Sequence, residues 1–269
     1  MKKRTVVIAE IGENHLGNWD IAKQMITEAA RAGADIVKFQ SYLGSEVRPE
    51  DPEREWFTKV EVTDAVHHEL KKHAEAAGVE FLSAPFSLGR AKLLVEGLGL
   101  RKIKVASSEM MNVRLLEYLN GRVDTVYLST GMATIDEIRQ SVSRLGKVKD
   151  VTILHCVTQY PTKPEDVNLL ALRALAEAFP ANALGYSDHT IGLDAAVLAV
   201  ALGARVIEKH FTLGKALPGT DHVLSVTPDE LKELVARIRL AESLLGRAVK
   251  EPVAGEKEIV SFVRGRFPK

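Results

Sequence analysis

Eight short runs rich in valine and isoleucine recur along this chain of 269 residues, and they limit the folds open to it. The runs cover residues 5–11, 36–40, 80–86, 102–107, 125–130, 151–156, 184–189 and 206–211. Most of them are nearly continuous in apolar residues and do not alternate with polar ones. This pattern is typical of strands covered on both faces, as in a parallel sheet.

Segments with helical spacing of apolar residues separate these runs. They include residues 20–33, 63–78, 134–146, 194–204 and 227–246. Alternating strands and helices are compatible with an open doubly wound sheet or with a closed barrel. Eight repeats in about 250 residues favour the barrel. We therefore predict an α/β fold, a single-domain (β/α)8 TIM barrel spanning residues 1–269, with a short C-terminal tail from about residue 250.

Charge and cysteine content narrow the class of protein. Lysine and arginine together number 36 and are matched by 36 acidic residues, so the basic excess of a nucleic-acid-binding protein is missing. Cys156 is the single cysteine, which excludes an intrachain disulfide framework. The first apolar run is short and contains Glu10, unlike a signal peptide, and no apolar stretch is long enough to span a bilayer. We expect a cytoplasmic globular protein with neither nucleic acid nor membrane as a partner.

Two lysines lie inside predicted strands, where an unpaired charge is costly. Lys38 occurs in "IVKFQ" and Lys104 in "KIKVAS". Each could form a structural ion pair, for instance Lys104 with Glu10 or Glu109. However, hydroxyl residues follow the neighbouring strands, and in a barrel these strand ends meet at one mouth. Ammonium and hydroxyl groups together suit a phosphate or carboxylate ligand.

Two histidines end the last two predicted strands. His189 lies in "SDHTIG" and His210 in "EKHF". Adjacent strands would place the two imidazoles side by side, and such a pair suits Mn²⁺, Fe²⁺, Co²⁺ or Zn²⁺. Asp188 and Glu208 could add an oxygen ligand or support the imidazoles. The alternative is a hydrogen-bonded pair of histidines without a metal.

Other polar residues carry no specific signal. His67, His68 and His73 are expected to lie on a solvated helix face. Residues 49–56, "PEDPEREW", are expected to form an exposed connection rather than a lid.

Nine motifs in one order carry a family resemblance. They are "AEIGENHLGN", "VKFQSY", "SAPFS", "KVASSE", "STGM", "LHCVTQYPT", "GYSDHTIG", "EKHFTL" and "PGTDH", between residues 9 and 222. The chain resembles the sialic acid synthase family, which includes N-acetylneuraminate, legionaminate and pseudaminate synthases and related spore-coat polysaccharide proteins.

The resemblance implies a (β/α)8 barrel that condenses phosphoenolpyruvate with an N-acetylated aldose such as N-acetylmannosamine. The products are a nonulosonic acid and phosphate, released by C–O cleavage, as expected of a transferase of the EC 2.5.1 type. A divalent metal, Mn²⁺ above all but also Co²⁺, Mg²⁺, Fe²⁺ or Zn²⁺, would bind His189 and His210. A homodimer is also expected from the resemblance.

The same resemblance assigns substrate contacts. Phosphoenolpyruvate would contact Lys38, Lys104, Ser107, Ser129, Thr158 and Ser187, where Thr158 stands at a position held by Asn or Ser in some relatives. Sugar contacts would come from Glu10, Gln40, Tyr160 and Asp221. Glu109 would be an acid/base, and Lys38, Lys104 and Glu10 would complete the catalytic set.

One departure and two alternatives remain open. The family normally continues into an antifreeze-like domain that contacts the sugar, whereas this sequence stops at Lys269, just past the predicted barrel. A 3-deoxy-sugar-acid synthase using phosphoenolpyruvate, or a metal-dependent aldolase acting on a shorter aldehyde, would keep the barrel and much of the chemistry. A non-catalytic barrel that binds a ligand or partner is the alternative from another class.

Overall fold

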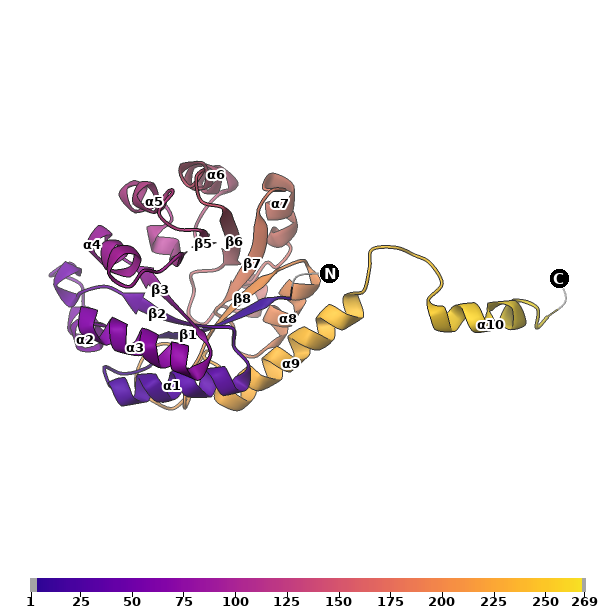
Figure 1. Ribbon diagram of the computed structural model, residues 1–269, viewed down its shortest axis with the longest axis horizontal. Helices are drawn as coiled ribbons and strands as arrows, with labels where there is room; N and C mark the ends of the chain where they lie inside the picture. The colour runs from indigo at the N-terminus through magenta and orange to yellow at the C-terminus, as the bar shows by residue number, and fades with distance from the viewer. Residues whose placement is uncertain (1–3, 268–269) are drawn as a thin grey trace.

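Eight parallel strands form the centre of the molecule in a computed structural model that describes residues 4–267 (Figure 1). The strands are β1 Val6–Gly12, β2 Ile36–Ser41, β3 Glu80–Pro85, β4 Lys102–Val105, β5 Thr125–Ser129, β6 Asp150–Cys156, β7 Ala183–Asp188 and β8 Val206–His210. They run in the spatial order β3-β2-β1-β8-β7-β6-β5-β4. Strands β3 and β4 lie next to each other at the two ends of this order, so the sheet is a nearly closed barrel and the predicted fold is confirmed.

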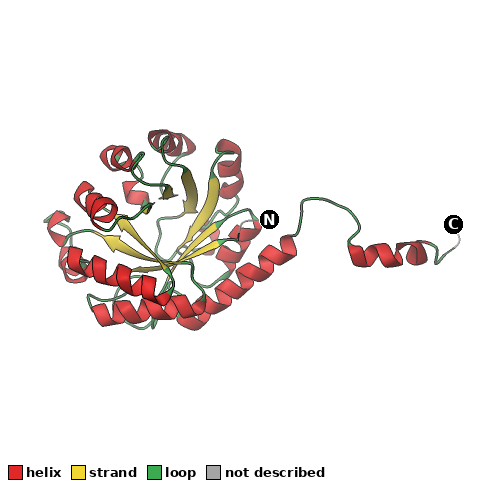
Figure 2. Ribbon diagram, viewed as in Figure 1, coloured by secondary structure: helices red, strands yellow, loops and turns green. Residues whose placement is uncertain are grey.

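All helices except the last surround the barrel on its outside (Figure 2). The helices are α1 Trp19–Ala32, α2 Arg54–Val60, α3 Asp64–Ala77, α4 Leu88–Lys92, α5 Val113–Leu119, α6 Ile135–Arg144, α7 Ala171–Ala178, α8 Asp194–Ala201, α9 Pro228–Leu245 and α10 Ala254–Arg264. A π-helical turn follows α4, and short 3₁₀ turns lie at Gly44–Glu46, Ser107–Glu109 and Pro164–Asp166. Helix α10 stands apart from the barrel with exposed side chains. Within residues 4–267, no helix is long and apolar enough to cross a membrane.

Local sequence signals set the helix ends. The Thr63 side chain accepts a hydrogen bond from the Val66 amide at the start of α3, and Gly78 ends that helix with a left-handed φ of 74°. At the start of α6, Thr134 and Glu137, three residues apart, form a reciprocal capping box. These features confirm the predicted helices over residues 63–78 and 134–146.

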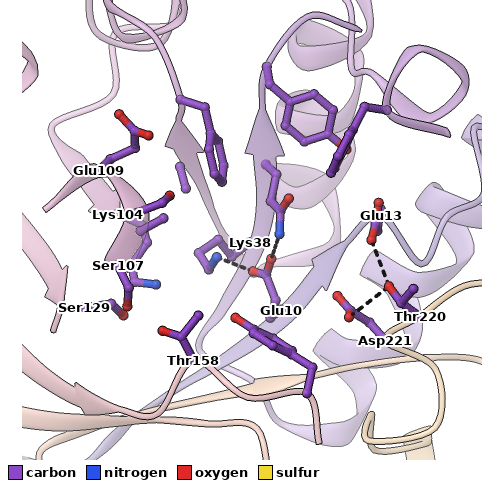
Figure 3. Close-up of a pocket in the computed structure, with 18 of the residues that line it drawn as sticks. Glu10, Glu13, Lys38, Lys104, Ser107, Glu109, Ser129, Thr158, Thr220 and Asp221 are labelled. Carbon is purple, nitrogen blue, oxygen red and sulfur yellow. Dashed lines mark hydrogen bonds and ion pairs between the residues drawn. The ribbon is translucent and has the colours of Figure 1, made fainter. Parts of the chain in front are cut away.

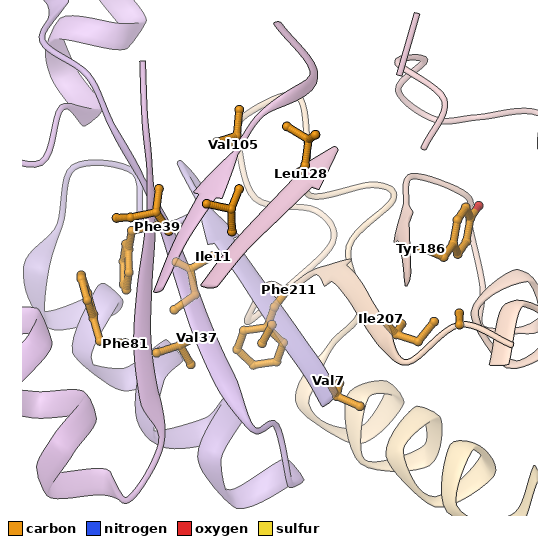
Figure 4. Close-up of a cluster of buried hydrophobic side chains, with 14 of the residues drawn as sticks. Val7, Ile11, Val37, Phe39, Phe81, Val105, Leu128, Tyr186, Ile207 and Phe211 are labelled. Carbon is orange, nitrogen blue, oxygen red and sulfur yellow. The ribbon is translucent and has the colours of Figure 1, made fainter. Parts of the chain in front are cut away.

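Strand side chains alternate between two cores. Outward-facing residues such as Val7, Phe39 and Ile207 pack against the helices in the large core (Figure 4). A smaller apolar cluster fills the barrel interior, and its buried members are Ile8, Ile36, Leu82, Tyr127, Leu154 and Val206. Because alternate residues share a face, the residues two positions after this cluster also face inward, one step closer to the carboxyl ends of the strands.

His67 corrects one expectation from the sequence. Instead of being solvated, it is fully buried between α3 and β3, with its ring edge-on to Phe81. Its Nδ1 lies 3.0 Å from the Thr63 carbonyl oxygen and 3.3 Å from an Arg90 guanidinium nitrogen. Burial lowers the pKa of His67 to about 4. His68 is exposed as expected, while His73 is half-buried.

Acid should therefore destabilise the fold through His67. Between pH 6.5 and about 4 the unfolded chain binds a proton at this imidazole and the folded chain does not, so stability falls as the pH falls. We expect His67→Gln to reduce the slope of the unfolding free energy against pH, by up to about 1.4 kcal/mol per pH unit. Urea unfolding over this range measures the slope. His68→Gln is the matched control, and an equal slope in both variants would contradict the assignment.

Candidate active site

A cavity of about 880 Å³ opens at the carboxyl ends of the strands (Figure 3). All eight strands, or the residues directly after them, contribute to its lining. Every residue predicted to bind phosphoenolpyruvate, sugar or metal lies in its wall: Glu10, Lys38, Gln40, Lys104, Ser107, Glu109, Ser129, Thr158, Tyr160, Ser187, His189, His210 and Asp221. Strands far apart in the sequence thus bring one set of polar side chains together.

Buried ion pairs form the floor of this cavity. Lys38 Nζ lies 2.5 Å from Glu10 Oε2 and 3.7 Å from Glu208 Oε2. Lys104 Nζ lies 2.9 Å from Glu208 Oε1, which also accepts a 2.9 Å hydrogen bond from Ser187. Both lysines and both glutamates are buried. The sequence predicted that the lysines converge, but Glu208, rather than Glu10 or Glu109, is the partner of Lys104.

The two glutamates of this floor differ in their pKa values. Burial raises the pKa of Glu10 to about 7, against the opposing effect of Lys38. Burial acts in the same direction on Glu208, but Lys104 and Lys38 outweigh it and hold the pKa of Glu208 at about 2. Near neutral pH, Glu208 is therefore ionised and Glu10 is partly protonated. Burial lowers the pKa of Lys104, while Glu10 and Glu208 outweigh burial and raise the pKa of Lys38. When both lysines are protonated, they carry more charge than the carboxylates neutralise, which favours an anionic ligand.

Hydroxyl groups extend the cationic floor on one side. Ser107 Oγ accepts a 3.0 Å hydrogen bond from the Gly131 amide. The buried Ser129 hydroxyl has no hydrogen-bond partner within the described part of the chain. A side chain at Gly131 would place its Cβ 2.2 Å from Thr158 Oγ1 and 2.8 Å from Ser107 Oγ. Any other residue at position 131 would collide with the Thr158 and Ser107 hydroxyls, so glycine leaves both hydroxyls accessible from the cavity.

His189 and His210 meet at the same mouth, with ring centroids 5.5 Å apart. His189 Nδ1 donates a 2.7 Å hydrogen bond to the Val157 carbonyl, which leaves its Nε2 for another ligand. Tyr160 stacks on His189 at 4.1 Å. His210 Nδ1 is buried without a hydrogen bond, although Asp221 Oδ2 lies 3.4 Å away.

This pair of imidazoles fits a divalent metal in its chemistry. Burial lowers the pKa of His189 to about 4 and that of His210 to about 3, so both rings are neutral near pH 7, as a metal ligand must be. The backbone acceptor that orients His189 is the usual support of a histidine ligand. Among residues 4–267, no group of three or more His, Cys, Asp or Glu side chains is arranged to hold a metal. Further ligands would have to come from water or substrate.

A second buried ion pair supports the loop that carries His189. Lys209, fully buried, lies 3.0 Å from Asp188 Oδ2 and also donates to the Thr190 carbonyl. Asp188 Oδ1 accepts hydrogen bonds from the Thr190 amide and the Tyr186 hydroxyl. Asp188 therefore stabilises the backbone on either side of His189 and does not line the cavity.

The opposite side of the cavity carries carboxylates that the sequence analysis missed. Glu13 accepts hydrogen bonds from the Trp56 indole and, at 3.4 Å, from Thr220, which also contacts Asp221 at 3.3 Å. The segment expected to be a plain connection supplies Asp51 and Glu53 to the wall. The sequence did contain a signal for these residues: the long segment after β2 is rich in acidic residues and follows a strand that lines the cavity.

Glu109 lies on the cavity wall after β4. Its Oε2 accepts a 2.7 Å hydrogen bond from Asn112, and Figure 3 shows it on the side of Ser107 and Lys104. Gln40 donates to Glu10 at 3.4 Å. The roles predicted for these side chains remain predictions.

The structure is an α/β barrel with two buried lysines, several hydroxyl groups and a pair of histidines at its mouth. Comparison with known proteins identifies its family. The model of the NeuB family matches residues 25–250. The N,N'-diacetyllegionaminic acid synthase of Campylobacter jejuni is 38% identical over 97% of this chain and 84% of its own length. Human N-acetylneuraminate-9-phosphate synthase is 35% identical over 91% of this chain and 72% of its own length.

A solved structure agrees with these sequence matches. The N-acetylneuraminic acid synthetase of Leptospira borgpetersenii superposes with a TM-score of 0.92 at 34% identity, covering 98% of this chain and 92% of that one. The chain belongs to the NeuB family, whose synthases are phosphoenolpyruvate-dependent transferases.

Breaking the Lys209–Asp188 pair should destabilise the barrel strongly. We expect Lys209→Met to cost about 3–5 kcal/mol in urea unfolding, because a buried carboxylate would lose its counterion. Lys209→Met combined with Asp188→Asn should recover part of that loss. The half-exposed pair Lys102–Glu80 is the control, and Lys102→Met should cost less than about 1 kcal/mol. Equal costs for the two single variants would contradict this role.

Proposed function

We propose that this chain condenses phosphoenolpyruvate with an N-acetylated aldose, similar to N-acetylmannosamine, to give a nonulosonic acid and phosphate. The observation that carries the proposal is the composition of one cavity. Its floor holds two buried lysines, open hydroxyls flank them, and a pair of neutral histidines lies across the same mouth. Family membership supports the same chemistry.

The lysine side of the cavity suits phosphoenolpyruvate. Lys38 and Lys104 would bind the phosphate and carboxylate oxygens, and Ser107, Ser129, Thr158 and Ser187 would donate hydrogen bonds to them. Glu208 contacts both lysines and holds them above the apolar cluster of the barrel interior. Because these groups are already in place, they can also stabilise the charge on the departing phosphate.

The histidine side suits the aldehyde. His189 and His210 would hold a divalent metal, for which we propose Mn²⁺, and such an ion supplies Lewis-acid polarisation of the aldehyde oxygen. Tyr160, stacked on His189, and Gln40, bonded to Glu10, would contact the sugar beside that position. Asp221 lies next to His210 and would accept hydrogen bonds from sugar hydroxyls.

The reaction balances with one proton moved between these groups. Carbon 3 of phosphoenolpyruvate bonds to the aldehyde carbon, the aldehyde oxygen gains a proton, and carbon 2 becomes positively charged. Water adds to carbon 2 and releases a proton. The tetrahedral intermediate then loses phosphate by C–O cleavage, the hydroxyl proton on carbon 2 passes to the departing phosphate, and carbon 2 becomes the carbonyl of a 2-keto acid. Glu10, partly protonated near pH 7, and Glu109 on the wall are the proposed proton carriers.

Isotope transfer tests this reaction directly. With phosphoenolpyruvate labelled with ¹⁸O at the bridging oxygen, N-acetylmannosamine and Mn²⁺, we expect phosphate release that requires both substrates. The label should appear in the phosphate, because the bond broken is C–O. Mass spectrometry of the phosphate measures it. Unlabelled phosphate, or release without the aldose, would show a different reaction.

His189→Ala separates the metal from the anion site in the same assay. The variant should lose turnover and the thermal stabilisation by Mn²⁺, while phosphoenolpyruvate alone still raises its melting temperature. Retained turnover would rule out His189 as a metal ligand.

Phosphoenolpyruvate binding should be linked to the protonation of Glu10. The ligand adds negative charge beside this carboxyl and raises its pKa further, so binding above about pH 7 takes up a proton. Affinity should then fall by up to ~tenfold per pH unit above that point. Calorimetry in buffers of different ionisation enthalpy measures the proton uptake. Glu10→Gln should abolish it, and uptake that persists in this variant would place the proton elsewhere.

A further inference from the structure

Charge is distributed unevenly across the cavity. One side holds Lys38 and Lys104 with their partners Glu10 and Glu208, the hydroxyls, and Glu109. We call the other carboxylates of the cavity lining the carboxylate rim; they are Glu13, Glu46, Asp51, Glu53 and Asp221. Among the described residues that line the cavity, Arg48 is the only cationic side chain besides the two floor lysines. In Figure 3, Glu13, Thr220 and Asp221 lie together across the cavity from Ser107 and Ser129.

Hydrogen bonds fix several of these carboxylates in position. Glu13 is held by Trp56 and Thr220. Glu46 accepts a 2.8 Å hydrogen bond from Ser87, and Asp51 accepts a 2.9 Å hydrogen bond from the Glu53 amide. Asp221 is largely buried next to Glu13, and burial together with Asp221 raises the pKa of Glu13 to about 7. The positions of these carboxyl groups are therefore a fixed property of this wall.

Two further features of this side point to a sugar. Tyr42, Phe57 and Phe86 line the cavity, with Tyr42 edge-on to the other two rings at 5.1 and 5.7 Å. Aromatic walls beside fixed acceptors suit a ligand with apolar faces and many hydroxyl donors. His210 Nδ1, in a side chain only 7% exposed, lies at the inner edge of this region without a hydrogen-bond partner in the described chain.

The proposed reaction sets the direction in which an aldose can bind. Its aldehyde carbon must reach carbon 3 of phosphoenolpyruvate, which is held at the lysines. With the aldehyde oxygen at the histidines, this end of the sugar lies beside Asp221, and the rest of the sugar extends toward Glu13, Asp51 and Glu53. A terminal hydroxyl there can donate to carboxylate oxygens. A phosphate dianion has no proton to donate and would be repelled by the ionised carboxylates of the rim.

We infer that the aldose substrate carries a free terminal hydroxyl rather than a phosphate, and that the carboxylate rim makes this distinction. The inference rests on the proposed function. Family membership does not decide the point, because the chain is similar both to a synthase named for a 9-phosphate product and to one whose name contains no phosphate. The charge on the cavity wall is the feature that does.

Competing substrates test the inference. With phosphoenolpyruvate and Mn²⁺ held constant, kcat/KM is measured for N-acetylmannosamine and for its 6-phosphate. We expect kcat/KM to be at least ~tenfold higher for the neutral sugar, because charge repulsion of the phosphate would weaken its binding by at least that factor. Preference for the 6-phosphate would overturn the inference and leave the proposed function standing. Turnover of neither sugar would overturn the proposed function itself, and the inference with it.

Neutralising part of the rim tests its role. In the double variant Asp51→Asn with Glu53→Gln, the ratio of kcat/KM for the 6-phosphate to that for the neutral sugar should rise by roughly threefold to tenfold. Glu50→Gln with Glu55→Gln is the matched control, because both side chains are exposed on the same segment and lie outside the cavity lining. Added salt should also narrow the preference of the unmodified protein. An unchanged ratio in the rim variant would overturn the role of the rim.

Discussion

The network of Lys38, Lys104, Glu10 and Glu208 is the interaction on which the cavity depends. Four ionisable side chains project from four strands and are buried directly above an apolar layer that includes Ile8, Ile36 and Val206. Such groups are expensive to bury, and replacing an ion pair by apolar residues often stabilises a protein. Their presence here therefore points to ligand binding, while the large outer core between strands and helices supplies the stability.

Strand alternation explains why the chemistry sits at this height in the barrel. Every second residue of a strand faces the barrel interior. Of three such residues, the first packs in the apolar layer, the second lies in the charged layer, and the third lies at the mouth. Strand β8 shows this in Val206, Glu208 and His210, and β2 shows it in Ile36, Lys38 and Gln40. A shift of one residue in either strand would turn the charges into the helix layer. The outer core thus holds the register that aligns the site.

The same alternation shows how far sequence reasoning reaches. The strands, five of the helices, and the lysines and histidines in or after the strands could be predicted from local spacing, whereas the other substrate contacts were implied by the family resemblance. The pairing of Lys104 with Glu208 could not, because it depends on how strands distant in the sequence face each other inside the barrel. His67 was misplaced for a similar reason: its burial comes from Arg90 and Phe81, which lie on other elements. Glu13 could not be predicted either, because its position depends on a hydrogen bond from Trp56, which lies on a distant segment.

The Lys209–Asp188 pair and the surroundings of the cavity lysines differ in whether their buried polar groups have hydrogen-bond partners. This difference distinguishes a supporting ion pair from a binding site. Lys209 and Asp188 satisfy each other and the backbone around them. Around the cavity, by contrast, the Ser129 hydroxyl and His210 Nδ1 are buried without a hydrogen bond in the part of the chain described. An unmet buried polar group costs about 1–3 kcal/mol, so a ligand that meets it recovers that free energy on binding. Because one such group lies on the lysine side and the other beside the carboxylate rim, both halves of the cavity are built to take a polar partner.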